Sequence, residues 1–335
     1  MSGKAHPSTG SEGTTGTNSS AGAPSTDSTG ETEGAANRHG NALVEGITTA
    51  FSWLSVIPVR GAQVFDRRTG RRAIAAAPAV AVVPGLAAVA LVAALLAAPI
   101  VLAAEPGTAA LRGVLAGVAI AAAAQLLTRA MHADGLADVA DALGSYKDPA
   151  GAREILRDPR MGPMAAVTLI LVQLTAAASF GVLALATTAK WLPGWSPTTS
   201  HPMLADAVSI ASVPDLLSGA ALLTLPFLVG RIAAVMACHH AFPPLTRTGF
   251  GFLVAATQPR WAIASWMGLG ALVAYWAAGG LGVVALGLTL VACWIFVRHC
   301  VRRLGGVNGD VLGAIIELGT VFCAFSLALT SPFIQ

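Results

Sequence analysis

The feature that most restricts the fold of this chain is a series of long segments with almost no charge. Residues 74–104, 113–128 and 164–189 contain no Asp, Glu, Lys or Arg, and 207–230 holds only Asp215. A further 37 uncharged residues lie between Arg260 and Arg298, and 311–334 is apolar except for Glu317. Because a transmembrane helix needs about 20 apolar residues, the sequence predicts repeated crossings of a bilayer.

The count of expected spans is seven. The stretch between Arg260 and Arg298 is split by Gly279 and Gly280, and each half is just long enough to cross, so this stretch is expected to be a helical hairpin. A bend is expected at Pro84 within the first span. Segment 43–60 is shorter and contains Pro58, so it is not counted as a span.

Composition supports the same fold class. Hydrophobic residues make up 55% of the 335 residues and charged residues 11%, whereas soluble domains carry about 25% charge. The net charge of +3 excludes a nucleic-acid binder that relies on a basic patch. The four cysteines show no C-x-x-C spacing, which argues against a zinc site or a disulfide framework. Two tyrosines against 36 glycines favour a bundle of helices over a β-barrel. We therefore expect an all-α, polytopic integral membrane protein.

Two regions are predicted. Residues 1–40 are rich in Ser, Thr, Gly and Ala and nearly lack large apolar side chains, so they are expected to form a disordered tail. Residues 41–335 are expected to form one membrane-embedded domain. If the N-terminus is cytoplasmic, at least 13 Lys and Arg residues fall in inside segments, and the outside loops contain only Arg112 and Lys190. The positive-inside rule then places all the polar motifs on the cytoplasmic face.

The strongest functional signal is a cluster of acids between residues 129 and 162, which hold six of the chain's 17 acidic residues. Asp134, Asp138 and Asp141 are spaced i, i+4 and i+7, which places three carboxylates on one face of a helix. Like charges at this spacing repel each other unless a cation lies between them. Oxygen ligands alone suit Mg²⁺. The alternative is a solvated surface loop, but Gly135 in the same helix permits close backbone approach.

Other polar residues have alternative interpretations. His132 is either a catalytic base or an ordinary interfacial histidine, and Asp148, next to Pro149, is expected in a turn or N-cap. The segment 304-LGGVNGDVLGA-314 is either a phosphate cradle or a glycine-rich turn that Asp310 caps. Arg231 and Glu317 fall within spans, where ionisable groups usually face the interior. They are expected to form an ion pair, or else Arg231 faces an anionic substrate.

At 132-HADGLADVAD-141, continuing to 153-REILRDPRMG-162, the sequence resembles the cobalamin synthase family, the adenosylcobinamide-GDP ribazoletransferases. The segment 305-GGVNGDVLG-313 is similar to a second block of that family, and 54-LSVIPVR-60 to its N-terminal element. The resemblance covers about residues 43–330. It implies a bacterial enzyme of the cell membrane that joins α-ribazole, or its 5′-phosphate, to adenosylcobinamide-GDP with release of GMP, late in cobalamin biosynthesis.

The resemblance also implies roles for individual residues. An alcohol that attacks a pyrophosphate needs charge neutralisation more than a covalent intermediate, so Mg²⁺ is the expected cofactor. One of three groups is expected to accept the proton of the attacking hydroxyl, and the choice stays open among His132, Asp134 and Asp138. The expected metal ligands are Asp134, Asp138, Asp141 and Asp158. The expected substrate contacts are Glu154, Arg157, Arg160, Arg231, Arg247, Gly305, Gly306, Gly309 and Asp310.

Two other classes of membrane protein share some features with this sequence. A CDP-alcohol-type membrane phosphotransferase also uses several aspartates on a helix, but its D-x-x-D-G-x-x-A-R pattern lacks its first acid here, where Met131 stands, and its arginine. A secondary transporter would show internal repeats and broken helices near the midplane, and no such repeat is found in the sequence. The expected partners are the two small-molecule substrates and the lipid bilayer, with a homo-oligomer left open and no nucleic acid.

Overall fold

The computed structural model describes residues 39–97, 109–192 and 211–331. The tail predicted at residues 1–40 lies outside this part of the chain except for its last two residues. Residues 98–104, 207–210 and 332–334 of the predicted spans lie outside it as well. All regular elements of the described residues are helices and none is a strand, which confirms the all-α fold class. Only two isolated β-bridges occur among them.

Six helical segments of the described residues are long and apolar enough to cross a membrane. They are Arg67–Leu96, Ala109–Leu127 (α6), Pro163–Trp191 (α9), Val213–Ala237 (α10), Arg260–Leu304 (α12) and Gly309–Thr330 (α13). Each overlaps a stretch that the sequence predicts as a span, so the polytopic membrane fold is confirmed. The count of seven crossings stays a prediction.

The 45-residue helix α12 contains the break that the sequence predicts. Ala278 and Gly279 leave the helical conformation, and Gly279 has a φ of +61°, which favours glycine. A side chain added at Gly282 would overlap the carbonyl oxygen of Ala274. In a straight helix these two residues would lie about 12 Å apart, so the chain turns back at Gly279.

The first long segment is made of three pieces. Helix α3 (Arg67–Ala76) continues into a 3-10 turn (Ala77–Ala81) and then into α4 (Val82–Ala97). Proline at position 84 removes one backbone donor and its ring crowds the carbonyl four residues earlier. The irregular turn lies directly before Pro84, so the change in helix geometry occurs one turn earlier than the residue at which the sequence predicts it.

Glycines allow the long helices to approach one another closely. A Cβ atom at Gly117 of α6 would overlap the carbonyl oxygen of Ala177 in α9, and one at Gly113 would lie 2.9 Å from Leu185. Such small-residue contacts are typical of helix packing in membranes, where close van der Waals contact takes the place of the hydrophobic effect. Helix α10 is the most buried of the long helices and packs against α4, α9, α12 and α13.

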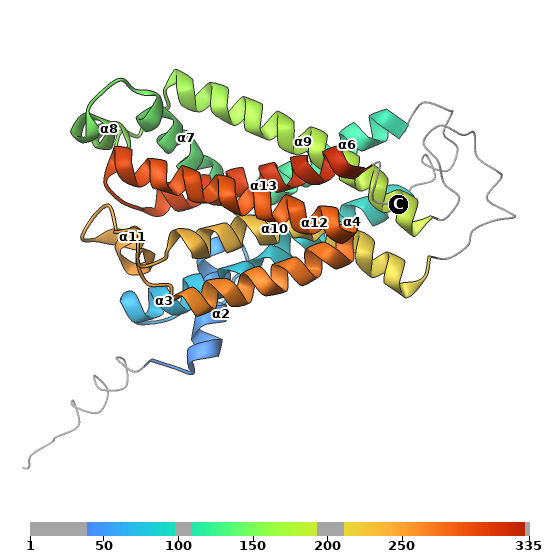
Figure 1. The fold of residues 1–335 in the computed structure, drawn as a ribbon, viewed down its shortest axis with the longest axis horizontal. Coiled ribbons are helices and arrows are strands. Elements are labelled where there is room, and N and C mark those ends of the chain that lie inside the picture. Colours follow the sequence, from blue (N-terminus) through green and yellow to red (C-terminus); the bar gives the residue numbers. More distant parts are fainter. Residues whose placement is uncertain (1–38, 98–108, 193–210, 332–335) are drawn as a thin grey trace, which may run out of the picture. The chain divides into compact units, whose positions relative to one another are not determined.

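Four short helices lie at one end of the long ones: α2 (Ala42–Leu54), α7 (Met131–Gly144), α8 (Pro149–Ile155) and α11 (Gly249–Val254). Figure 1 shows α7, α8 and α11 at the same end of α10, α12 and α13. Asp148 caps α8 by accepting a hydrogen bond from the amide of Gly151 at 2.9 Å, which confirms its predicted role. Helix α2 is tied to α3 by an ion pair between buried Glu45 and Arg72 at 2.9 Å.

The contact between α6 and α9 gives a first test. Replacing Gly117 by Ala forces two backbones apart, so we expect the variant to lose about 1–3 kcal/mol of stability and to show a lower thermal midpoint in detergent. The matched control is Gly287→Ala in α12, where nothing lies within 4 Å of an added Cβ. The control should match or slightly exceed the wild type, because alanine is the better helix former. Equal midpoints for the two variants would contradict the close contact.

Candidate active site

The acidic helix α7 begins after a strained turn. Arg129 and Ala130 both have left-handed backbone conformations, with φ of 55° and 52°. For residues with a side chain this conformation costs on the order of 1–3 kcal/mol each, and such strain is concentrated at functional sites. The turn brings the guanidinium of Arg129 to the end of α2, where it donates to the carbonyl oxygen of Trp53 at 3.2 Å.

Two glycines then hold α7 against the start of α13. A Cβ atom at Gly135 would lie 2.7 Å from the carbonyl oxygen of Asp310, and one at Gly313 would lie 3.2 Å from the backbone of His132. Any larger side chain would separate the two helices. The close approach predicted for Gly135 is therefore confirmed, and its consequence is that residues of both helices face one cavity.

That cavity has a volume of about 620 Å³ and is open to one side. Such a volume is within the usual range of ligand sites, about 300–1,000 Å³. Four of the predicted site residues line it, His132, Asp134, Gly309 and Asp310. The other side chains that line it are Ser52, Trp53, Leu54, Phe65, Ile74, Arg129, Met131, Phe250, Leu253, Leu312 and Ile316.

Three carboxylates gather where α7 meets α13. Burial raises the pKa of Asp138 to about 6, and the nearby negative charges of Asp310 and Asp134 add to this effect. None of the three forms an ion pair with Lys or Arg in the described part of the chain. Oxygen donors of this kind match the preference of Mg²⁺. As the side chains stand, however, no three His, Cys, Asp or Glu groups of the described residues are arranged to hold an ion.

The third aspartate of the helix face, Asp141, has a structural contact. Its carboxylate accepts hydrogen bonds from the backbone amides of Gly162, at 2.5 Å, and Ala165, at 2.8 Å. These amides belong to the first turn of α9, which otherwise lacks a side-chain cap. Asp141 thus fixes α9 relative to α7. Its role as a metal ligand stays a prediction.

His132 separates the large cavity from a second, much smaller one and lines both. The imidazole is 5% exposed, and its Nε2 has no hydrogen-bond partner among the described residues. Burial lowers the pKa of His132 to about 3, and the positive charge of Arg231 contributes. The imidazole is therefore uncharged at neutral pH.

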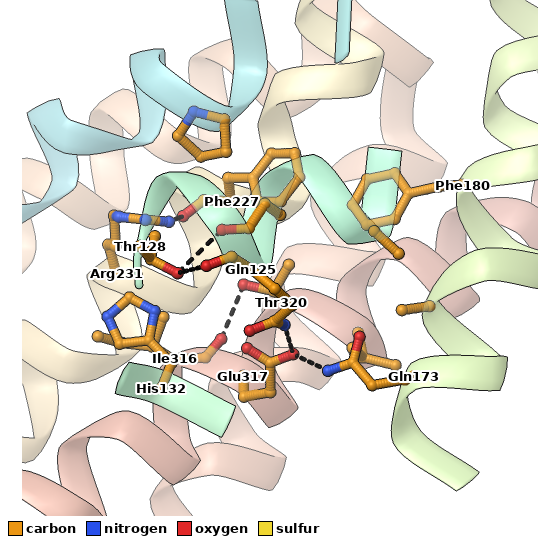
Figure 2. Close-up of a pocket in the computed structure, with 15 residues that line it drawn as sticks. Gln125, Thr128, His132, Gln173, Phe180, Phe227, Arg231, Ile316, Glu317 and Thr320 are labelled. Carbon is orange, nitrogen blue, oxygen red and sulfur yellow. Dashed lines mark hydrogen bonds between the residues drawn. The ribbon is translucent and has the colours of Figure 1, made fainter. Parts of the chain in front are cut away.

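The second cavity lies between α6, α9, α10 and α13 and has a volume of about 20 Å³, close to that of one water molecule. Figure 2 shows His132 and Arg231 on one side of it and Glu317 with Gln173 on the other. Glu317 accepts hydrogen bonds from the side-chain amides of Gln125, at 2.7 Å, and Gln173, at 2.6 Å.

Arg231 and Glu317 form no direct ion pair in the described residues, so that alternative is wrong. The Nη1 of Arg231 donates instead to the carbonyl oxygen of Phe227 at 3.1 Å, and amide side chains satisfy the carboxylate. Arg231 is 1% exposed and lines the small cavity behind His132, and it is not among the residues that line the large one. The contact of Arg231 with substrate stays a prediction.

The residues predicted on and after α8 lie apart from the large cavity and are mostly exposed. Asp158 forms an ion pair with Arg160 at 2.7 Å, and hydrogen bonds from Arg160 lower the pKa of Asp158 to about 2. Glu154 and Arg157 are exposed. Their neighbour Arg153 holds α8 to the end of α12 by donating to the carbonyl oxygen of Leu304 at 3.1 Å. The expected metal and phosphate roles in this segment stay predictions.

The glycine-rich segment has separate local roles. Gly305 ends α12 in a left-handed conformation with φ of 99°. The backbone packs closely at Gly306, where an added Cβ atom would lie 2.6 Å from the backbone nitrogen of Leu245. The helix α13 is capped by Asn308, whose side chain accepts from the amide of Val311 at 3.1 Å, so the expected capping by Asp310 is wrong. Arg247 is exposed in the preceding loop. Gly309 is the one glycine of the three that lines the cavity.

Sequence reasoning missed Arg129, Trp53 and Phe250. Arg129 lies three residues before His132, and a signal for it was available, since a cation directly beside an acidic motif is unusual in a chain with 11% charge. Trp53 and Phe250 come from α2 and α11, which are distant in sequence from α7. Only the packing of these helices brings their side chains to the acids.

Comparisons with known proteins agree with the motif. The sequence profile of the family described as Cobalamin-5-phosphate synthase matches residues 46–328. A relative from Corynebacterium efficiens is 40% identical over 305 residues, which cover 87% of this chain and 94% of that protein. Relatives from Corynebacterium diphtheriae and Frankia casuarinae are 30% and 31% identical and cover 94% of their own length. Each is named adenosylcobinamide-GDP ribazoletransferase. No solved structure matches the chain.

The raised pKa of Asp138 predicts how stability depends on pH. Because this pKa is about 6 in the folded protein and 3.8 for an ordinary aspartate, the metal-free protein loses stability as pH rises from about 4 to about 6. Asp138→Asn removes this loss. We expect the variant, in EDTA at pH 7.5, to be more stable than the wild type by on the order of 1 kcal/mol, after allowance for partial exposure.

The measurement is the thermal midpoint in detergent at pH 4.5 and 7.5, with the exposed Glu154→Gln as the control. The advantage of Asp138→Asn should shrink at the lower pH, and the control should follow the wild type at both. An advantage that is independent of pH would contradict the raised pKa of Asp138.

The cap on α9 gives a separate prediction. Asp141→Leu leaves the amides of Gly162 and Ala165 without their acceptor, so we expect a loss of about 0.5–2 kcal/mol in stability. Asp141→Asn keeps an acceptor oxygen and should lose less. Chemical denaturation in detergent measures both values, and an equal loss for the two variants would argue against the cap.

Proposed function

This chain belongs to the Cobalamin-5-phosphate synthase family, and we propose on that premise that it acts as an adenosylcobinamide-GDP ribazoletransferase. In the proposed reaction, a ribose hydroxyl of α-ribazole that is also free in α-ribazole 5′-phosphate attacks the phosphate that is attached to cobinamide. One P–O bond forms, the P–O bond to the GMP leaving group breaks, and the hydroxyl proton passes to a base. The product is adenosylcobalamin, or its 5′-phosphate if α-ribazole 5′-phosphate is the acceptor.

The observation that supports this chemistry best is the meeting of Asp134, Asp138 and Asp310 where α7 packs against α13, with Asp134 and Asp310 lining the large cavity. Two motifs that are about 170 residues apart in sequence supply these carboxylates, and Gly135 and Gly313 bring them together. A phosphoryl transfer between two charged groups depends mainly on positioning and on neutralisation of charge. Carboxylates that form no ion pair with Lys or Arg repel phosphate groups. A bound cation between them would turn this repulsion into attraction.

We propose that this cation is Mg²⁺, with Asp134, Asp138 and Asp310 as ligands and Asp141 and Asp158 as the further candidates from sequence. The carboxylates would have to turn towards one another to share it. Mg²⁺ held by these carboxylates would supply charge neutralisation at the phosphate oxygens. The protein supplies the rigid approach of the two helices, which keeps the ligands in place.

Other side chains of the cavity have supporting roles. His132 is uncharged and lines both cavities, so it can form a hydrogen bond to substrate without adding charge. The proton of the hydroxyl passes either to His132 or to one of the aspartates. Arg129 is the arginine that lines the cavity, and we propose that it contacts the departing phosphate. Arg157, Arg160 and Arg247 are proposed phosphate contacts during substrate entry.

The protein is a membrane protein, and we propose that the end carrying α7, α8 and α11 faces the cytoplasm. Lysine and arginine are concentrated in the segments at this end, as the positive-inside rule requires of cytoplasmic loops. The proposed location is the cell membrane of a bacterium, where both substrates would reach the cavity from the cytoplasm.

The experiment uses the full chain, purified in mild detergent and mixed with adenosylcobinamide-GDP and α-ribazole, with Mg²⁺ or with EDTA. Chromatography follows GMP and the corrinoid product. We expect equal amounts of both products, dependence on Mg²⁺, and a loss of at least about 100-fold in kcat/KM for Asp134→Asn. The matched control is Asp215→Asn, an exposed acid at the start of α10, which should keep wild-type activity.

A second readout separates metal binding from turnover. Mg²⁺ should raise the thermal midpoint of the wild type, because a ligand that binds only the folded state stabilises it, and this shift should be absent in Asp134→Asn. A folded wild-type protein that forms no product with any divalent metal would refute the proposed activity. Product formed equally in EDTA would refute the metal.

A further inference from the structure

Three aromatic side chains from separate parts of the chain meet on one wall of the large cavity. Trp53 comes from the last turn of α2, Phe65 from the loop before α3 and Phe250 from α11. The rings of Trp53 and Phe65 are nearly parallel, with centroids 6.1 Å apart, and Phe250 meets Trp53 edge to face at 5.3 Å. These distances fall in the range of favourable aromatic pairs, about 4.5–7 Å.

The stability of the fold does not account for this wall. Phe65 is 64% exposed, and Trp53 and Phe250 are only partly buried, so much of their apolar surface stays in contact with the cavity. Aromatic residues at a membrane interface normally face the lipid. These rings instead line a cavity that also contains Asp134 and Asp310, and a lipid chain there would have to remove water from two carboxylates at considerable cost.

The polar side of the same cavity lies next to the rings. Arg129 is hydrogen-bonded to the backbone of Trp53, and Asp134 and Asp310 line the cavity with it. A ligand that fits has a flat apolar part for the rings and an anionic or hydroxyl-bearing part for the charged groups. A nucleoside or nucleotide has both, because its base is flat and its sugar carries hydroxyls and phosphate.

We propose that Trp53, Phe65 and Phe250 bind the planar heteroaromatic base of a nucleoside or nucleotide substrate and thereby help to select it. The inference rests on the proposed function, in which both substrates carry such a base, benzimidazole in α-ribazole and guanine in adenosylcobinamide-GDP. Stacking of a base on an aromatic side chain is worth about 1–3 kcal/mol, which corresponds to about 5- to 150-fold in affinity. The wall places the base beside the carboxylates at which phosphoryl transfer is proposed.

The test measures binding without turnover. Equilibrium dialysis of the full chain in detergent gives the dissociation constants of α-ribazole alone and of GDP alone, which separates the two sources of the base. We expect Trp53→Leu to weaken one of these ligands about 5- to 150-fold and Trp53→Phe, which keeps a flat ring, to weaken it less. The matched control is Trp261→Leu, since Trp261 is exposed at the start of α12 and does not line the cavity.

Because Trp53→Leu can fail to fold, Phe65→Leu is the second variant, at an exposed position where folding is little affected. Wild-type affinity for both ligands in both variants would overturn the proposal, and so would a wild-type protein that binds neither ligand. Binding by the wild type without product formation would refute the proposed activity but leave the base site intact. Normal turnover with unchanged affinities in the variants would refute the base site alone.

Discussion

The close contact between α7 and the start of α13 is the constraint on which the rest of the site depends. Gly135 lies against the backbone of Asp310, and Gly313 lies against the backbone of His132. A Cβ atom at either position would displace a neighbouring atom. This contact brings together carboxylates that are about 170 residues apart in sequence. Burial is the main cause of the raised pKa of Asp138, and the contact adds the effect of the negative charges of Asp310 and Asp134. Moving the two helices apart would weaken the repulsion between these carboxylates, but it would also separate the residues of the site.

Polar side chains of the domain line two separate cavities. At the end of the bundle, the acids and Arg129 line an open cavity, where water and substrate can reach them. Behind His132, Glu317 accepts hydrogen bonds from the side-chain amides of Gln125 and Gln173, and buried Arg231 donates to the backbone of Phe227. Ionisable groups at membrane depth are costly, so the two glutamines explain how Glu317 is accommodated without an ion pair. His132 lies between the two cavities and lines both.

Some of the architecture follows directly from local sequence. The long uncharged segments form long helices, Gly279 reverses α12, Asp148 caps α8, and Gly135 permits close approach. Each of these features depends on one segment or one residue type, so periodicity and turn chemistry are enough to predict it. The acids of α7 were identified for the same reason. Where two segments had to be placed relative to each other, as with Arg231 and Glu317, the sequence left alternatives open and the structure excluded one of them.

The sequence by itself determined that this chain is a helical membrane protein and that its acids are concentrated between residues 129 and 162. Only the tertiary structure decided what surrounds each of those acids. Asp134 lines the cavity, Asp138 is coupled to Asp310, and Asp141 caps α9 instead, although the three share one helix face. The aromatic wall and Arg129 were likewise decided by packing. The physical reason is that spacing along a helix fixes the direction of a side chain, whereas the neighbour that it meets depends on how the helices pack.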